Sequence, residues 1–174
     1  MSDTRGPTPA HPDDPSEQSL WRPVFDLHRD LDDEIARIYA ENDIPDLKTN
    51  WVWVILRLRA QGPMTIAELA RSMNQTHSAL SQKVTAMRKA GWVETSPGPD
   101  ARAKEVSLTI KAERVADRLA AEWRATEASI AEIEAEVPYP LSKVAADIRA
   151  ALARKSFHDR IAEKLAADPA WSDS

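Results

Sequence analysis

Apolar residues recur at intervals of three and four positions in several segments, and this spacing predicts amphipathic helices. In the first segment we expect a helix that starts after an N-cap at Ser19, carries Pro23 in its first turn and ends near Asn42. Its apolar face is formed by Leu20, Val24, Leu27, Leu31, Ile35 and Ile38. A turn at residues 44–46 should follow.

A second apolar stripe predicts a helix from about Leu47 to Ala60, stopped by residues 61–63, which read Gln-Gly-Pro. The positions expected on its buried side are Leu47, Trp51, Val54, Ile55 and Leu58.

Two short helices joined by a tight polar turn are the next predicted elements. Thr65, followed three residues later by Glu68, has the spacing of a capping box at the start of the first helix. Residues 74–76 supply the turn, and Thr76 is expected to cap the second helix. Gly91 suits the left-handed residue that ends this helix. The inward positions are Ile66, Leu69, Ala70 and Met73 in the first helix and Leu80, Val84 and Met87 in the second.

A hairpin and further helices complete the pattern. Residues 92–95 and 105–108 are predicted strands around a loop rich in turn-forming residues at 96–100. A long helix is expected beyond Thr109, and residues 137–140, which read Val-Pro-Tyr-Pro, should end it before a last helix. The long helix carries Val115, Leu119, Trp123, Thr126, Ile130, Ile133 and Val137 on one side, and the last carries Leu141, Val144, Ile148, Leu152, Ile161 and Leu165.

Charge is unevenly distributed along the 174 residues. The net charge is −5, but residues 1–46 carry −8, residues 47–114 carry +6 and residues 115–174 carry −3. A basic middle is typical of a segment that binds a polyanion, because Lys and Arg replace the counterions of phosphates. A solvated helix face can also carry such a charge, so the count alone leaves both interpretations open.

Composition excludes several classes of protein. The absence of cysteine excludes disulfides, thiolate metal sites and thiol-based peroxide sensing. No apolar run approaches the roughly 20 residues of a membrane-spanning helix. Residues 1–18 are acidic and rich in proline, which predicts a disordered tail and not an export signal. We therefore expect a cytoplasmic protein with no contact to a membrane.

The segment from residue 65 to residue 109 resembles the MarR family of bacterial transcriptional regulators, which are winged helix-turn-helix dimers. The resemblance rests on residues 65–70, which read TIAELA, on the turn at residues 91–94, and on the Asp100-x-Arg102 pair followed by residues 106–109. It implies a mainly α fold with a small β-hairpin wing, in which a winged helix-turn-helix core is flanked by long N- and C-terminal dimerisation helices. The implied division is a tail at 1–18, a dimerisation helix at 19–46, the DNA-binding domain at 47–109, dimerisation helices at 110–168 and a tail at 169–174.

The resemblance also implies that the helix from Thr76 to Ala90 enters the major groove of double-stranded DNA as part of a homodimer. Hydrogen-bonding side chains near its start suit contacts with base edges and phosphates, and these are Gln75, Thr76, His77, Ser78, Ser81 and Gln82. Lys83 and Arg88 are expected nearer the phosphates. Arg102 at the wing tip is the candidate for the minor groove, with Lys104 on the adjacent backbone. Such a dimer would read a pseudo-palindrome and, by the usual outcome in the family, repress transcription.

Members of this family commonly respond to a small ligand, and an aromatic effector is therefore expected here. The candidate residues for its pocket are His28, Trp51, Trp53 and Trp123. Trp51 and Trp123 also fall on apolar stripes, where a core position explains them better than a pocket does. No cofactor or metal is implied.

Three other functions can be compared with DNA binding on the same residues. An enzyme lacks support, because the four histidines show no metal-binding spacing and four glycines form no phosphate loop. A zinc sensor could use His28 with nearby aspartates, although solvated helix charges explain these residues better. The third is a winged-helix module for protein interaction that has lost DNA binding. Its support is the acidic ends of the chain and Thr95, where many family members carry arginine.

Overall fold

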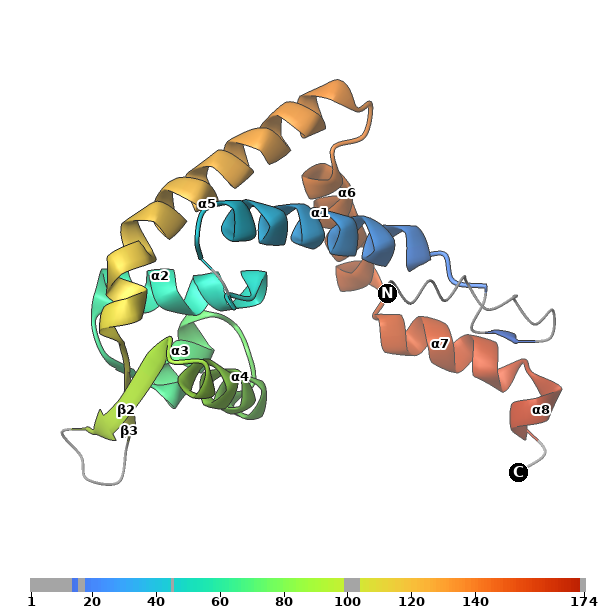
Figure 1. Cartoon of the computed structure of the whole chain (residues 1–174). Coiled ribbons are helices and arrows are strands. Elements are labelled where there is room, and N and C mark those ends of the chain that lie inside the picture. The colour runs from blue at the N-terminus through green and yellow to red at the C-terminus, as the bar shows by residue number, and fades with distance from the viewer. Residues whose placement is uncertain (1–13, 16–17, 45, 99–103, 173–174) are drawn as a thin grey trace. The chain divides into compact units, whose positions relative to one another are not determined.

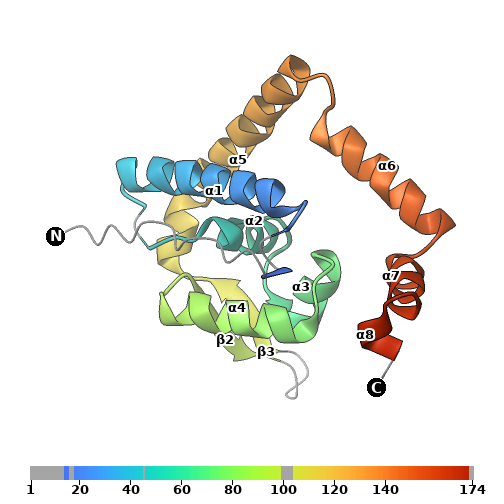
Figure 2. The same cartoon turned by 90° about the vertical axis from the view of Figure 1, so that its right-hand side faces the viewer.

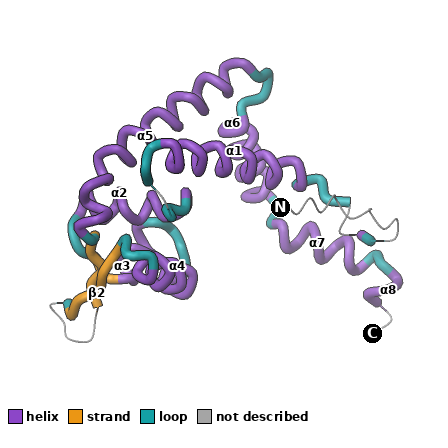
Figure 3. Tube along the Cα trace, viewed as in Figure 1, coloured by secondary structure: helices purple, strands orange, loops and turns teal. Residues whose placement is uncertain are grey.

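The computed structural model describes residues 14–15, 18–44, 46–98 and 104–172 (Figure 1). The chain forms two compact units, Met1–Leu119 and Ala120–Ser174. The fold is mainly helical with one small antiparallel sheet, as the sequence predicted (Figure 3).

In the first unit, two helices and a helical turn come first. The first strand of the sheet, the helix pair, the other two strands and the start of a long helix then follow. The elements of this unit are α1 (Arg22–Glu41), η2 (Thr49–Trp51), α2 (Val52–Gln61), β1 (Met64–Thr65), α3 (Ile66–Ser72), α4 (His77–Lys89), β2 (Val93–Pro97), β3 (Lys104–Leu108) and the beginning of α5 (Ile110–Glu136). Figure 2 shows α3 and α4 side by side, with β2 and β3 next to α4.

The sheet has the strand order β1-β3-β2, and both pairings are antiparallel. Val93 pairs with Leu108 at the base of the hairpin, and Pro97 pairs with Lys104 at its far end. The sequence did not predict β1, because two residues are too short to show an alternating pattern. This strand forms when Met64 pairs with Val106, 42 residues further along the chain.

The core of the first unit contains many of the predicted apolar positions, together with Val52, Ala112 and Ala116, which the spacing did not identify. Leu69 of α3, Leu80 of α4, Ile55 of α2 and Leu119 of α5 are each fully buried. The core is closed on the sheet side by Val106, which is also fully buried. Of the side chains that the structure describes, those buried in the core all lie at or before Leu119.

Two helix starts differ from the sequence prediction. The first helix begins at Arg22 with Trp21 as its N-cap, and Ser19 contributes only its carbonyl oxygen, which accepts the Arg22 N–H at 3.2 Å. This start keeps Pro23, which has no N–H, within the first turn, where no intrahelical donor is needed. The second predicted helix begins only at Val52, because the preceding residues form the tighter turn η2.

The second unit contains the remainder of α5 and three further helices, α6 (Leu141–Arg154), α7 (Phe157–Ala166) and α8 (Pro169–Ser172). The sequence predicted one helix where the structure has α6 and α7. The division occurs because Ser156 adopts an extended backbone and its Oγ accepts the Asp159 N–H at 3.0 Å, which caps α7. The expected break at residues 137–140 is confirmed.

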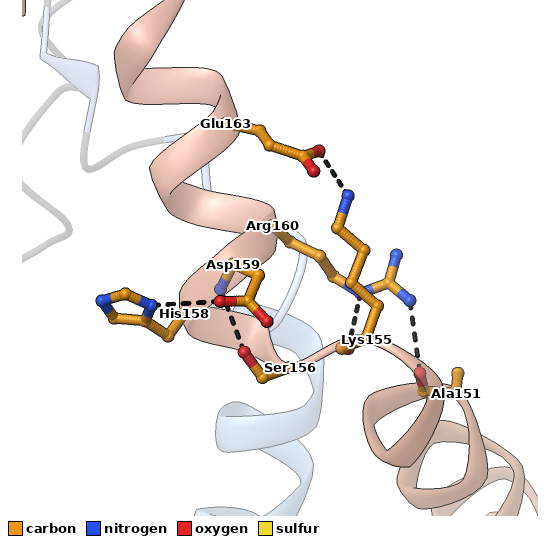
Figure 4. A network of polar contacts seen from close by, with 7 residues as sticks. All are labelled: Ala151, Lys155, Ser156, His158, Asp159, Arg160 and Glu163. Atoms are coloured by element: carbon orange, nitrogen blue, oxygen red, sulfur yellow. Dashed lines mark hydrogen bonds and ion pairs between the residues drawn. The ribbon is translucent and has the colours of Figure 1, made fainter.

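Side chains on both sides of this junction hold α6 and α7 together (Figure 4). Arg160 of α7 donates from Nε to the Lys155 carbonyl at 3.2 Å and from Nη2 to the Ala151 carbonyl at 3.3 Å. Lys155 forms an ion pair with Glu163. The junction is therefore a defined elbow within this unit, in which Arg160 caps the last carbonyls of α6.

Candidate nucleic-acid interface

The capping box at the start of α3 is confirmed. The Thr65 backbone N–H donates to Glu68 Oε2 at 2.8 Å, and the Glu68 N–H donates to Thr65 Oγ1 at 3.2 Å. The backbone hydrogen bond from Thr65, followed by the bond from its hydroxyl, holds the pKa of Glu68 below its ordinary value. These contacts fix the direction in which α3 leaves β1.

The turn between α3 and α4 depends on a left-handed residue. Asn74 has φ +51°, a conformation that asparagine tolerates better than most residues. The Gln75 N–H then donates to the Ala70 carbonyl at 2.9 Å, which closes the turn over the end of α3. Thr76 caps α4 as predicted, because its Oγ1 accepts the Ala79 N–H at 3.2 Å.

The helix α4 has one buried side and one exposed side. Leu80, Val84 and Met87 lie in the core, as the spacing predicted. The exposed side begins with Thr76, His77, Ser78 and Gln82, while Gln75 and Ser81 are half-buried at its edge. The six predicted reading residues therefore lie on the first half of α4 and the turn before it.

Thr85 is exposed on the same helix and was not among the predicted residues. It lies three and four positions after Gln82 and Ser81, so the helical spacing could have identified it. Its Oγ1 donates to the Ser81 carbonyl at 2.8 Å, which orients the side chain along the helix. Thr85 thus lengthens the exposed polar face toward Arg88.

The two predicted cations of α4 differ in surroundings. Lys83 is half-buried beside the core positions Leu80 and Val84, and this burial lowers the pKa of its ammonium group. Arg88 is exposed, and its Nη1 lies 3.4 Å from Thr95 Oγ1 of β2. Arg88 therefore joins the second half of α4 to the hairpin.

The hairpin extends from the same side of the unit as α4 (Figure 2). Lys104 is exposed at the start of β3. Arg102, together with Asp100 and Ala101, lies outside the described residues, so the predicted minor-groove contact has no structural description. Lys104 is the wing cation that the structure places.

The four residues proposed for a ligand pocket lie in different surroundings. Trp51 is buried, with Lys48 Nζ 5.4 Å from the centre of its ring, whereas Trp53 is half exposed. His28 is exposed on α1, and its Nδ1 lies 3.4 Å from Asp32 Oδ2. Trp123 is half-buried in the second unit. Trp51 is thus part of the core, and Trp53, two residues later, faces outward.

The described part of the chain has neither a metal-binding cluster nor a membrane-spanning helix. It contains no group of three or more His, Asp or Glu side chains arranged to hold a metal ion. None of its helices combines the length and apolar character that crossing a bilayer requires.

Residues 46–103 match the model of the MarR family. Among solved structures, the chain resembles the M. tuberculosis transcriptional regulator MOSR in complex with DNA, with 23% identity over 79% of this chain and 99% of that chain and a TM-score of 0.56. It also resembles the S. aureus MepR–DNA complex, with 11% identity over 78% of this chain and 97% of that chain and a TM-score of 0.59. The transcriptional regulator SlyA has 12% identity over 83% and 99% of the two chains and a TM-score of 0.56. No curated protein matches the sequence. At these identities the likenesses establish the winged-helix fold.

Proposed function

Because the chain belongs to the MarR family through residues 46–103, we propose that it is a transcriptional regulator that binds a specific DNA sequence as a homodimer. Proteins of this family are transcription regulators and not enzymes. The observation that carries the proposal is the exposed polar face at the start of α4, on a helix whose opposite side is anchored in the core.

In this proposal α4 enters the major groove with its N-terminal half foremost. Ser78, Ser81 and Gln82 have short hydrogen-bonding side chains that suit base edges, and the first N–H groups of the helix suit a phosphate. Support comes from the likeness to MOSR and MepR, both solved with DNA. The remaining proposed reading residues on this face are Gln75, Thr76 and His77.

The cations around α4 are proposed to contact the sugar-phosphate backbone. Lys83 and Arg88 lie five residues apart on α4, and Lys104 lies at the far end of the paired hairpin strands. Arg102, which the structure does not describe, is proposed from the sequence as the residue that enters the minor groove, where negative potential is concentrated.

Dimerisation is proposed from the apolar side chains that the terminal helices leave exposed. On α1 these include Leu27, which is 50% exposed, and Leu31, which is 41% exposed. No residue of α6 or α7 is buried, although both helices carry large apolar side chains. Several large apolar side chains exposed on one helix are typical of an interaction surface. A second copy of the chain would cover these helices and place two α4 helices on half-sites of a pseudo-palindrome, about one helical turn apart.

Repression and release by a small aromatic ligand complete the proposal. A dimer bound across a promoter would exclude the polymerase. Trp53 is the candidate that best supports a ligand site, because it is aromatic and half exposed; the proposed companions are His28, Trp51 and Trp123. Quenching of tryptophan fluorescence by aromatic acids tests this part, and a flat response to all of them contradicts it.

DNA binding is tested by sequencing the chromosomal fragments that the purified protein retains. We expect an enriched inverted repeat, and we expect affinity for it to fall steeply with salt as counterions are released. Arg102→Ala should reduce the slope of log affinity against log salt by about one. Retention of no fragment in dilute buffer would favour the alternative of a protein-interaction module.

A further inference from the structure

Trp92 follows the last turn of α4, and its side chain contacts two segments that are distant in sequence. The ring is 1% exposed, and its Nε1–H donates to the Asp46 carbonyl oxygen at 3.3 Å. Asp46 lies in the loop between α1 and η2 and has φ +62°. This hydrogen bond connects the end of α4 to the loop that follows α1.

Lys111, in the first turn of α5, contacts both Trp92 and α4. Its Nζ lies 4.1 Å from the centre of the Trp92 ring, well within the range of a cation–π contact. The same Nζ donates to the carbonyl oxygen of Ala90, the C-cap of α4, at 3.3 Å. A cation at this position also complements the partial negative charge at the C-terminus of the helix.

Thr109 adds a second connection between the same two helices. Its hydroxyl donates to the Gly91 carbonyl oxygen at 2.7 Å and accepts the Ala112 N–H at 3.3 Å, at the start of α5. The Thr109 N–H also donates to the Trp92 carbonyl oxygen at 3.3 Å. Within three residues after α4, the chain therefore bonds to the start of α5 through backbone, hydroxyl and ammonium groups.

We propose that Lys111 is a positioning residue for base reading, which holds the C-terminal end of α4 against α5 through Trp92 and so sets the angle of α4. The proposal rests on the proposed DNA binding. The 13 residues of α4 span about 20 Å, so a tilt of about three degrees at the clamped end moves the other end by about 1 Å. Hydrogen bonds to base edges are lost over such a distance, whereas flexible phosphate contacts adjust.

The test compares specific with nonspecific binding by the full chain. The probes are the tightest duplex that the wild-type protein selects from a random pool and a shuffled duplex of the same composition. Lys111→Met should lower the ratio of the two affinities about tenfold, the equivalent of one weakened base contact. Lys111→Arg keeps a cation and donors, so it should restore most of the ratio. Lys48→Met is the matched control, because it removes the same kind of cation–π contact at another tryptophan, Trp51.

A readout without DNA separates this inference from the proposed function. Loss of the Lys111 contact should speed exchange of the Trp92 indole N–H about two- to fivefold, and the global unfolding constant should rise by no more than the same factor. Unchanged exchange in Lys111→Met overturns the clamp whether or not the protein binds DNA. An equal loss of both affinities also overturns it, because Lys111 would then act as a phosphate contact. Failure of the wild-type protein to select any duplex, together with faster exchange in Lys111→Met, would reject DNA binding and retain the clamp as a device that orients α4.

Discussion

The winged-helix region and the terminal helices are both amphipathic, but they bury their apolar residues differently. In the region from η2 to the start of α5, every helix has side chains in the core, and Val52, Leu69 and Leu80 are fully buried. By contrast, α1 buries only Tyr39, and α6 and α7 bury no residue. Amphipathic helices of the same kind thus have a buried apolar face in the winged-helix region and an exposed one in the terminal helices.

The difference in burial indicates whether each region is packed by its own chain or needs a second surface to cover it. A helix in the winged-helix region is covered by neighbours from its own chain, so this region can hold its shape without a partner. The apolar faces of α1, α6 and α7 remain in contact with water, which opposes their folding until another surface covers them. We therefore expect substitutions in the core of the winged-helix region to lower its free energy of unfolding. Substitutions on the exposed apolar faces of the terminal helices should instead weaken the dimer.

The largest expected effect is on the core of the winged helix. Leu80→Ala should lower the free energy of unfolding by about 2 to 5 kcal/mol, because it leaves a cavity beneath α4. Leu152→Ala on α6, where the side chain is 37% exposed, should change the stability of a dilute sample by about 0.5 kcal/mol or less. Urea unfolding of both variants measures the contrast. Equal losses would mean that the two regions do not differ as described.

A smaller effect is expected at the proposed interface. Leu27→Glu should weaken the homodimer by about 1.5 to 3 kcal/mol, the free energy of burying one leucine side chain, or by about 10- to 100-fold in Kd. Ala36→Glu is the control, since Ala36 is exposed on the opposite side of α1. Sedimentation velocity over a dilution series gives both dissociation constants. A dimer equally tolerant of both substitutions would exclude this face of α1 from the interface.

Local signals in the sequence predicted most of the winged helix. Thr65 and Glu68, Thr76 and Gly91 each act within a few residues, so their spacing sufficed for the helix limits. The polar face of α4 followed from the same periodicity. The division at Ser156 could also have been found, because a serine three residues before an acidic residue is a known capping pattern.

Contacts between distant residues could not be predicted in this way. The pairing of β1 with β3 and the bond between Trp92 and Asp46 depend on tertiary packing. The contact of Arg88 with Thr95 likewise joins two elements whose relative placement the pattern does not specify. Periodicity identified the apolar faces of the terminal helices, but it did not show that they stay exposed in the single chain.

The starts of the helices differ in how they are capped. The helices α3 and α4 have side-chain caps from their own N-cap residues, as α7 has from Ser156, whereas α1 has none. Thr65→Ala removes the capping box and should lower stability by about 1 kcal/mol at neutral pH. Urea unfolding measures this loss, with Ser19→Ala before α1 as the control, because Ser19 contributes only its carbonyl oxygen to the start of that helix. A loss at Ser19 as large as that at Thr65 would contradict a stabilising role for the Thr65 cap.

The partner of Thr65 gives this effect a pH dependence. Because the folded-state pKa of Glu68 is lowered, its contribution is fully present above the ordinary glutamate pKa of about 4.3 and is lost as the pH falls through the lower folded-state value. Glu68→Gln should therefore be less stable than the wild type at neutral pH, and the difference should shrink in strong acid. A difference that does not change with pH would show that the carboxylate charge contributes nothing.

The smallest effect is expected at the turn before α4, where the backbone conformation and not a side-chain contact is decisive. Asn74→Gly should leave the free energy of unfolding within about 0.5 kcal/mol of the wild type, since relief at φ +51° is offset by the greater freedom of glycine in the unfolded chain. Asn74→Ala should be about 1 kcal/mol less stable than Asn74→Gly, because a Cβ without a polar group is strained in the left-handed region. The same pair of substitutions at Asp43, with φ +54° in the loop after α1, is the control in a loop outside the helix-turn-helix. Equal free energies of unfolding for Asn74→Gly and Asn74→Ala would show that the left-handed conformation at position 74 does not strain the alanine variant.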